Sequence, residues 1–154
     1  MIRIERNPGF WSAVASHPAV AGAIMGVAPE VIGELATRDT MLPLAAKHGG
    51  YLFGRADAFG FVAELHTLFT PEGWGREAVI AGIEALNAVF LLGYHLVTTF
   101  EAENNPRSRP PVTAGFVQAG EWRATPVGSL RLWVLTRAAW QASPAAKRRR
   151  RCQQ

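Results

Sequence analysis

The sequence predicts an α/β fold, a single mixed, mostly antiparallel twisted sheet of about six to seven strands with helices on both faces. Alternating, β-branched segments predominate from Met41 onward, which is the pattern of half-buried strands. One long segment, Arg76 to Leu92, instead repeats its apolar residues at helical spacing. The order is strand, helices, three strands, long helix, strand, short helix and two strands, which one sheet covered by helices accommodates.

The first third of the chain predicts a short strand followed by helices. The alternating segment MIRIER predicts the strand, and Asn7-Pro8 ends it and opens a helix, since proline is tolerated in a first turn. We expect the helix in GFWSAVASHPAV to break near Pro18. A second helical segment is expected from Pro29 to Ala36.

The middle of the chain predicts three strands, with the sequences MLPLAAKHG, GYLFGRAD and FGFVAELHTLF. Gly49-Gly50 is expected to close the first of them, and the Asp57-Ala58 corner predicts a hairpin between the other two. The long helix follows, and Gly93 suits its C-terminal cap.

The last third predicts three more strands. HLVTTFEAE is expected to form the first, and NNPRSRPPVTAG is a turn-rich connection with room for one helical turn, because Pro110 and Pro111 disrupt anything longer. FVQAGEWRAT and SLRLWVLTRAAW then predict a final hairpin through Pro126 to Gly128.

The composition is typical of one globular domain, with 154 residues, 49% hydrophobic and 18% charged. No apolar stretch reaches the about 18 residues of a membrane span, and the N-terminus lacks the apolar core of a signal peptide, so we expect a cytoplasmic protein without membrane contact.

A single cysteine, Cys152, excludes a disulfide framework and a cysteine-based zinc site. His17, His48 and His95 form no metal-ligand spacing, so no metal is expected and structural or surface roles are favoured for them.

The basic charge is concentrated at the end of the chain. Five of the 16 basic residues stand together in Lys147 to Arg151, and the rest of the chain has 11 basic and 12 acidic residues. We therefore expect residues 1–140 to form the domain and residues 141–154 a basic, disordered tail. The tail is either simply solvated or makes a weak contact with nucleic acid or another polyanion.

The stretch TPEGWGREA, Thr70 to Ala78, joins an apolar strand to the long helix through two glycines. Unpaired N–H groups and the positive end of the helix dipole favour an anion there, and Gly73 and Gly75 allow a phosphate to approach the backbone. The chain has neither the GK[ST] of a Walker A loop nor the third glycine of a dinucleotide fingerprint. A tight turn that needs glycine is the alternative.

On these residues the chain resembles the GCN5-related N-acetyltransferases. Their acetyl-coenzyme A loop reads Q/R-x-x-G-x-G/A between the fourth strand and the third helix, and TPEGWG falls at that place, with Thr70 where Gln or Arg is usual. The segment NNPRSRPPVTAGF is similar to the family's N-x-x-[AS]-…-G-F segment and ends in Gly115-Phe116. Its RPP version resembles acetyltransferase-like proteins of bacteriophages. The resemblance covers roughly residues 1–140 and implies the family's fold.

The resemblance implies acetyl-coenzyme A as co-substrate. The pantetheine arm would lie in a cleft where the strand ending ELHTLF splays from its parallel neighbour HLVTTFE. The pyrophosphate would sit on N–H groups of the glycine loop, with Arg76 adding charge. The cofactor-binding residues implied in this way are Leu65, Thr67, Leu68, Phe69, Gly73, Trp74, Gly75, Arg76, Asn104 and Asn105.

Glu64 and His66 are the first candidates for a general base. They lie two residues apart on the predicted central strand and so share one face. A histidine can take a proton from an ammonium group, and a carboxylate can do so through a water. Alternatively, Glu64 is a solvated or paired strand residue and His66 a structural one. Glu101 and Glu103, on the following strand, are the next candidates.

The family's usual general acid is absent from its expected position. The family often places a tyrosine about four residues before the GF glycine, and this position is Pro111, which cannot donate a proton. The two tyrosines, Tyr51 and Tyr94, lie elsewhere in the sequence. Water or another side chain would have to protonate the departing thiolate, unless the chemistry is altered or lost.

The resemblance therefore implies an N-acetyltransferase that moves an acetyl group from acetyl-coenzyme A to a primary amine by direct attack in a ternary complex. The acceptor, a small-molecule or protein amine, stays open, as does a homodimer. Trp11, Trp122 and Trp133 suit an acceptor pocket, or alternatively a core or an oligomer interface. Two further alternatives are a phage protein of this fold that modifies DNA bases, and a non-catalytic acyl-coenzyme A-binding or virion-associated module.

Overall fold

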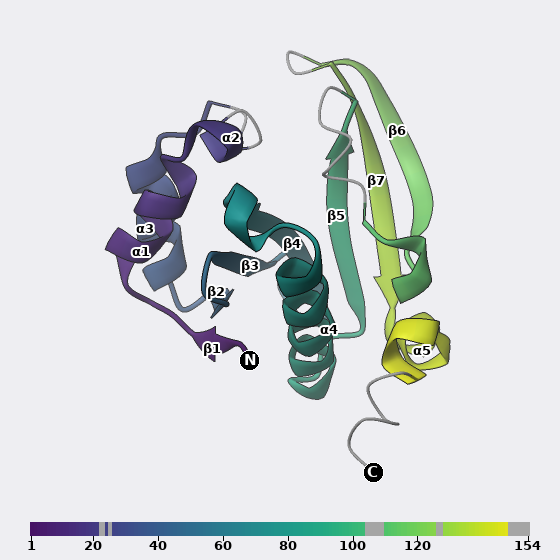
Figure 1. The fold of residues 1–154 in the computed structure, drawn as a ribbon. Coiled ribbons are helices and arrows are strands. Elements are labelled where there is room, and N and C mark those ends of the chain that lie inside the picture. Colours follow the sequence, from purple (N-terminus) through teal and green to yellow (C-terminus); the bar gives the residue numbers. More distant parts are fainter. Residues whose placement is uncertain (22–23, 25, 104–109, 126–127, 148–154) are drawn as a thin grey trace. The chain divides into compact units, whose positions relative to one another are not determined.

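The computed structural model describes residues 1–21, 24, 26–103, 110–125 and 128–147 (Figure 1). It contains a seven-stranded sheet in the order β1-β2-β3-β4-β5-β7-β6, accompanied by helices. This confirms the fold class predicted from the sequence. The chain divides into two compact units, Met1–Arg55 with Leu65–Leu86, and Ala56–Glu64 with Asn87–Gln154, and each unit is described by itself.

The elements follow the predicted order. The strands are β1 (Arg3–Ile4), β2 (Met41–Ala45), β3 (Gly49–Arg55), β4 (Val62–Phe69), β5 (Leu96–Ala102), β6 (Val117–Thr125) and β7 (Gly128–Thr136). The helices are α1 (Pro8–Ala15), α2 (Pro18–Ala21), α3 (Pro29–Thr37), α4 (Arg76–Leu91) and α5 (Arg137–Ala142), with 3₁₀ turns η1 (Pro71–Gly73) and η3 (Val112–Ala114). Pairing is antiparallel for β1–β2, β2–β3, β5–β7 and β6–β7, and parallel for β4–β5.

The core of the first unit forms between α1, α3 and the strands. Trp11 is fully buried at its centre, which favours the core alternative for this tryptophan. Gly33 of α3 lies so close to α1 that a Cβ there would stand 2.6 Å from the carbonyl oxygen of Pro8. The buried members of this cluster are Trp11, Val14, Ala15, Val20, Ile24, Ile32, Ala36, Ala45, Leu52 and Leu68.

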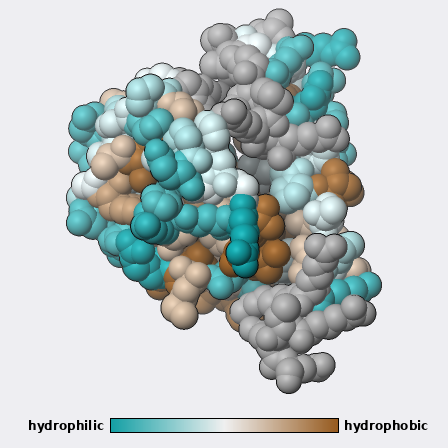
Figure 2. Space-filling model, in the orientation of Figure 1, coloured by the Kyte–Doolittle hydropathy of each residue, from teal (hydrophilic) through white to brown (hydrophobic). Residues whose placement is uncertain are grey.

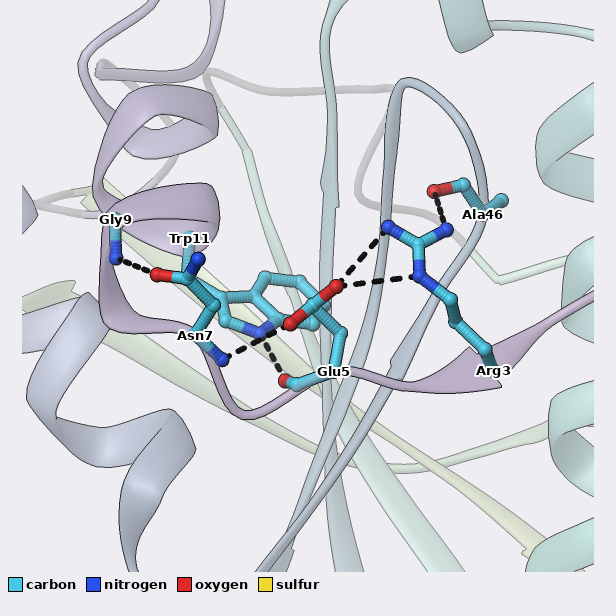
Figure 3. Close-up of polar contacts among 6 residues, drawn as sticks. All are labelled: Arg3, Glu5, Asn7, Gly9, Trp11 and Ala46. Carbon is cyan, nitrogen blue, oxygen red and sulfur yellow. Dashed lines mark hydrogen bonds and ion pairs between the residues drawn. The ribbon is translucent and has the colours of Figure 1, made fainter.

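A polar network fixes the entry into α1 (Figure 3). Asn7 caps the helix by accepting the N–H of Gly9 on its Oδ1, at 2.9 Å. The Glu5 carboxylate accepts the Asn7 N–H at 3.0 Å and the Arg3 guanidinium at 3.1 and 3.2 Å. The indole N–H of Trp11 donates to the Glu5 carbonyl at 2.6 Å. The hydrogen bond from the Asn7 N–H lowers the pKa of Glu5. Burial acts in the opposite direction, and the Arg3 guanidinium adds a smaller lowering effect.

Replacing the cap should destabilise the protein measurably. We expect Asn7→Ala to lower the free energy of unfolding by about 1 kcal/mol, because the Gly9 N–H loses its acceptor. Asn7→Asp is the matched control and should stay close to the parent, since its carboxylate accepts the same bond. Urea unfolding at neutral pH measures both, and equal stability of Asn7→Ala and Asn7→Asp would contradict the capping role.

The second unit is organised around β5, β7 and β6. Val97 of β5 pairs with Leu135 of β7, and both side chains are fully buried. The rings of Phe90 and Trp140 stack with centroids 6.5 Å apart, which packs α5 against the end of α4. Gly115, at the end of η3, has φ of +97°, and a Cβ there would lie 3.0 Å from the Ala139 carbonyl oxygen. Glycine is therefore required at this position.

The structure corrects two strand boundaries. Gly49 and Gly50 begin β3 and do not close β2, because Gly50 pairs with Ala45 in the β2–β3 ladder. The segment RAAW is the start of α5 and not the end of the last strand. The Thr136 side chain accepts the Ala139 N–H at 3.1 Å, so this residue caps a helix where the strand was expected to continue.

The chain also stays packed beyond residue 140. Ser143 and Ala146 are buried, and the Ser143 hydroxyl accepts the Ala146 N–H at 3.1 Å. Residues up to Ala146 are thus part of the folded unit, and residues 148–154 of the expected tail lie outside the described part. Within the described residues, no helix is long and apolar enough to cross a membrane.

The exposed apolar side chains are distributed rather than gathered on the face seen in Figure 2, where small hydrophobic areas alternate with hydrophilic ones. Phe59 and Phe61, both exposed, stack on each other in the turn before β4, with ring centroids 6.2 Å apart. Trp122 of β6 is 49% exposed and lies against Phe100 of β5. The exposure of Trp122 distinguishes it from Trp11 and Trp133, which are buried.

Candidate functional site

The glycine loop lies entirely within the first unit. It leaves β4 at Phe69, makes the 3₁₀ turn η1 and enters α4 at Arg76. The Gly73 N–H donates to the Thr70 carbonyl at 2.9 Å and the Trp74 N–H to the Pro71 carbonyl at 3.2 Å, so the turn is closed by its own backbone. The Trp74 indole N–H donates to the Phe69 carbonyl at 3.0 Å, which holds the ring against the end of β4.

The two glycines of the loop are needed for different reasons. Gly73 is buried, and a Cβ on it would lie 2.8 Å from the Phe69 ring and 3.1 Å from the His48 Cβ. Gly75 has φ of +80°, a conformation that favours glycine, and no atom would lie within 4 Å of an added Cβ. Only Gly75 therefore combines an exposed backbone with open space above it, as a close approach by a ligand requires.

The backbone N–H groups of the loop also differ, in whether they already have a hydrogen-bond acceptor. The N–H groups of Gly73 and Trp74 already have backbone acceptors, although both residues are among the expected pyrophosphate contacts. The first N–H groups of α4, starting with Arg76, have no acceptor within the helix. The capacity to bind an anion is therefore greatest at Gly75 and the first turn of α4.

The charges around the loop are mixed. Arg76 is exposed at the start of α4, while Glu72 and Glu77 add two carboxylates. A hydrogen bond from the Thr70 side chain lowers the pKa of Glu72. The Glu77 carboxylate accepts the backbone N–H and the ring Nδ1 of His48, both at 2.8 Å. Burial works in the opposite direction, but these bonds lower the pKa of Glu77.

In the second half of β4, Leu65, Leu68 and Phe69 are buried in the core, whereas His66 and Thr67 are exposed. The expected pairing of a pantetheine arm with the backbone of this segment stays a prediction.

The other candidate base, Glu64, lies on β4 in the second unit. It is half-buried and aligned with Thr98 in the parallel pairing that joins Val62–Glu64 to Leu96–Thr98. The family resemblance implied this parallel pairing, and the structure contains it. The catalytic roles of Glu64 and His66, and the splaying of the strands, stay predictions.

The carboxylates of β5 are engaged in a network that the sequence did not reveal. Glu101 is buried and accepts the Trp133 indole N–H at 2.8 Å, with an Arg131 nitrogen 3.5 Å away. The strand register brings these side chains together, since Glu101 pairs with Arg131 and Thr99 with Trp133 across β5 and β7. The side chain and backbone of Ser129 lower the pKa of Glu103. Strand pairing was the missing signal, because the partners lie about 30 residues apart in sequence.

Tyr51 does not replace the expected general acid. Tyr51 donates its hydroxyl to the Ala78 carbonyl at 2.7 Å, and burial raises its pKa, so it keeps its proton. A Cβ on Gly82 would lie only 2.8 Å from this hydroxyl oxygen. Pro111, at the usual tyrosine position, precedes η3, and its hydrocarbon side chain has no proton to donate. Asn104 and Asn105 lie outside the described residues.

His48 is the residue that the sequence reasoning missed. The sequence gives it no metal-ligand spacing, but the structure places it beside Thr70, Gly73 and Glu77. The available signal was its position directly before Gly49-Gly50, a turn that brings backbone close to the end of β4. In the described part of the chain, no three His, Cys, Asp or Glu side chains are placed to hold a metal ion.

Comparison with solved structures identifies the fold. A chimera of the Vibrio cholerae spermidine N-acetyltransferase with hSSAT superposes with a TM-score of 0.71 at 16% identity, covering 92% of this chain and 98% of that one. An aminoglycoside acetyltransferase in complex with coenzyme A and kanamycin gives 0.68 at 15% identity, covering 92% and 96%. A probable acetyltransferase of the GNAT family from Chromobacterium violaceum gives 0.67 at 16% identity, covering 91% and 87%.

These similarities concern the fold, which is that of the GCN5-related N-acetyltransferases. No protein-family model and no curated protein sequence matches the chain. The structures named here give no support to a bacteriophage origin.

Proposed function

We propose that this protein is an N-acetyltransferase that moves an acetyl group from acetyl-coenzyme A to a primary amine. The observation that carries the proposal is the start of α4, where Gly75 leaves open space over an exposed backbone at a helix N-terminus. The sequence resemblance assigns the family's coenzyme A loop to this segment, and the fold is shared with acetyltransferases of spermidine and of aminoglycosides. Small-molecule amines are accordingly the first acceptors to test.

The residues present fit the co-substrate. Gly75, Arg76 and the first turn of α4 would hold the pyrophosphate, with the Arg76 side chain supplying a positive charge. The backbone of Leu65 to Phe69 would bind the pantetheine amides. When bound, the co-substrate supplies an activated thioester.

Direct attack requires the amine as a free base. Glu64 or His66 would remove a proton from the ammonium group, either directly or through a water. The nitrogen lone pair would then form a bond to the thioester carbonyl carbon, the carbon–sulfur bond would break, and the nitrogen would lose its second proton to water to give the amide. The thiolate leaves with the bonding electrons and takes a proton from water, because Pro111 cannot supply one.

A non-catalytic acyl-coenzyme A-binding protein is the second candidate. Pro111 favours it, since the chain lacks the usual proton donor at that position. Pro111 does not favour a DNA-modifying protein. The one argument for that function is the basic segment Lys147 to Arg151. Salt-sensitive DNA binding that disappears on deletion of residues 147–154 would support that third possibility.

The function can be tested by binding and then by turnover. We expect calorimetry to detect acetyl-coenzyme A binding, and a thiol assay to detect coenzyme A release only when a suitable amine is added. The amine panel should include spermidine, kanamycin and a lysine peptide. Binding without turnover across a broad panel would favour the non-catalytic protein, and absence of binding by every coenzyme A species would refute both.

A further inference from the structure

We infer that His48 is a positioning residue that keeps the start of α4 open to an anion, an inference that rests on the proposed function. His48 belongs to the turn between β2 and β3. Its carbonyl oxygen accepts the Thr70 N–H at 3.0 Å, and its Cβ lies 3.1 Å from where a Cβ on Gly73 would stand. One residue therefore supports the loop at both ends of η1.

The same residue holds both oxygens of the Glu77 carboxylate. Oε1 accepts the His48 backbone N–H and Oε2 faces the ring Nδ1, each at 2.8 Å. The two side chains are 30% and 28% exposed, so solvent screens this pair only in part. With neutral imidazole, the distance requires the tautomer in which Nδ1 carries the hydrogen and donates it.

Glu77 matters because it is the second residue of α4. A carboxylate in the first turn of a helix is attracted to the free N–H groups and to the positive end of the dipole. The backbone bond to Oε1 persists whatever side chain stands at residue 48, but without the Nδ1 bond Oε2 would be free to turn toward these groups. Glu77 would then compete with a bound phosphate for them, and its charge would repel the ligand. By holding the carboxylate, His48 reserves the N–H groups for the anion.

Calorimetry with coenzyme A and with inorganic pyrophosphate, at one fixed pH, tests this on the parent and three variants. We expect His48→Ala to bind both ligands about tenfold more weakly than the parent. His48→Asn, whose amide can replace the Nδ1–H donor, should stay within about threefold of the parent. The double variant His48→Ala/Glu77→Gln should recover most of the affinity, because the competing charge is gone.

Unchanged affinity in His48→Ala would overturn the inference. The inference would also be overturned if the double variant bound as weakly as His48→Ala, because the loss of affinity would then come from a disrupted loop and not from the Glu77 charge. A ligand-free readout separates this question from the proposed function. In a carbon-13 NMR titration, the pKa of Glu77 should rise in His48→Ala and stay low in His48→Asn. If the parent binds no coenzyme A, the function fails, and the titration still decides whether His48 holds Glu77.

Discussion

Gly49→Ala should lower the free energy of unfolding by about 3 kcal/mol. Gly49 has φ of +139°, which L-residues rarely adopt, and an added Cβ would collide with the Leu68 carbonyl oxygen and lie 2.6 Å from the Phe69 Cα. Both obstacles are backbone atoms of β4, so the clash can be relieved only by moving a strand. Chemical denaturation followed by tryptophan fluorescence measures the loss.

Gly54→Ala is the matched control for that prediction. Gly54 also lies on β3, but a Cβ there would meet only the flexible end of Met41, with the sulfur 3.1 Å away. We expect this variant to lie within about 1 kcal/mol of the parent. Similar losses for the two variants would mean that a strand methyl group, rather than the contact with β4, causes the effect.

Gly75→Ala should weaken coenzyme A binding about fiftyfold, or about 2.3 kcal/mol. The methyl group would enter the open space above Gly75, where we propose that a phosphate approaches the backbone, and the φ of +80° would be strained by any Cβ. Calorimetry at fixed pH measures the affinity, and denaturation of the same sample reports the strain.

The strain can be separated from the loss of binding by Gly26→Ala. Gly26 has φ of +79° and likewise has no atom within 4 Å of an added Cβ. It should therefore lose about the same stability, about 1 kcal/mol, while its coenzyme A affinity stays that of the parent. If Gly75→Ala binds as well as Gly26→Ala, the phosphate is not at the start of α4.

The fold was predictable from local patterns. The period of two in β4 and β5, the helical spacing in α4 and the glycine and proline positions identify nearly every element. The errors at Gly49 and at RAAW have a common cause, since both boundaries depend on contacts with residues that are distant in sequence or on a capping side chain. Gly49 begins a strand because β2 pairs with it, and Thr136 ends one because its hydroxyl oxygen caps α5.

The sequence predicted the part of the candidate site that is formed by backbone. It did not predict the part that is formed by contacts between side chains. The β4–α4 loop is visible in the sequence because glycine has few other reasons to stand twice between a strand and a helix. The sequence does not reveal that Gly73 is needed because its neighbours leave no room for a Cβ, whereas Gly75 is needed for its positive φ. In the sequence the two positions look the same. The Glu101–Trp133 and Glu77–His48 pairs require the register and the turn geometry, which only the folded chain supplies.

The hydroxyl of Tyr51 lies against the bare Cα of Gly82, so substitutions at the two positions should be coupled. A methyl group at residue 82 would stand 2.8 Å from the tyrosine oxygen, so the hydroxyl would have to shift or be lost. Among homologues, we therefore expect alanine at position 82 to accompany phenylalanine at position 51, and glycine to accompany tyrosine. Such a covariation between β3 and α4 would reflect the space at residue 82 together with the hydrogen bond that Tyr51 donates to the Ala78 carbonyl.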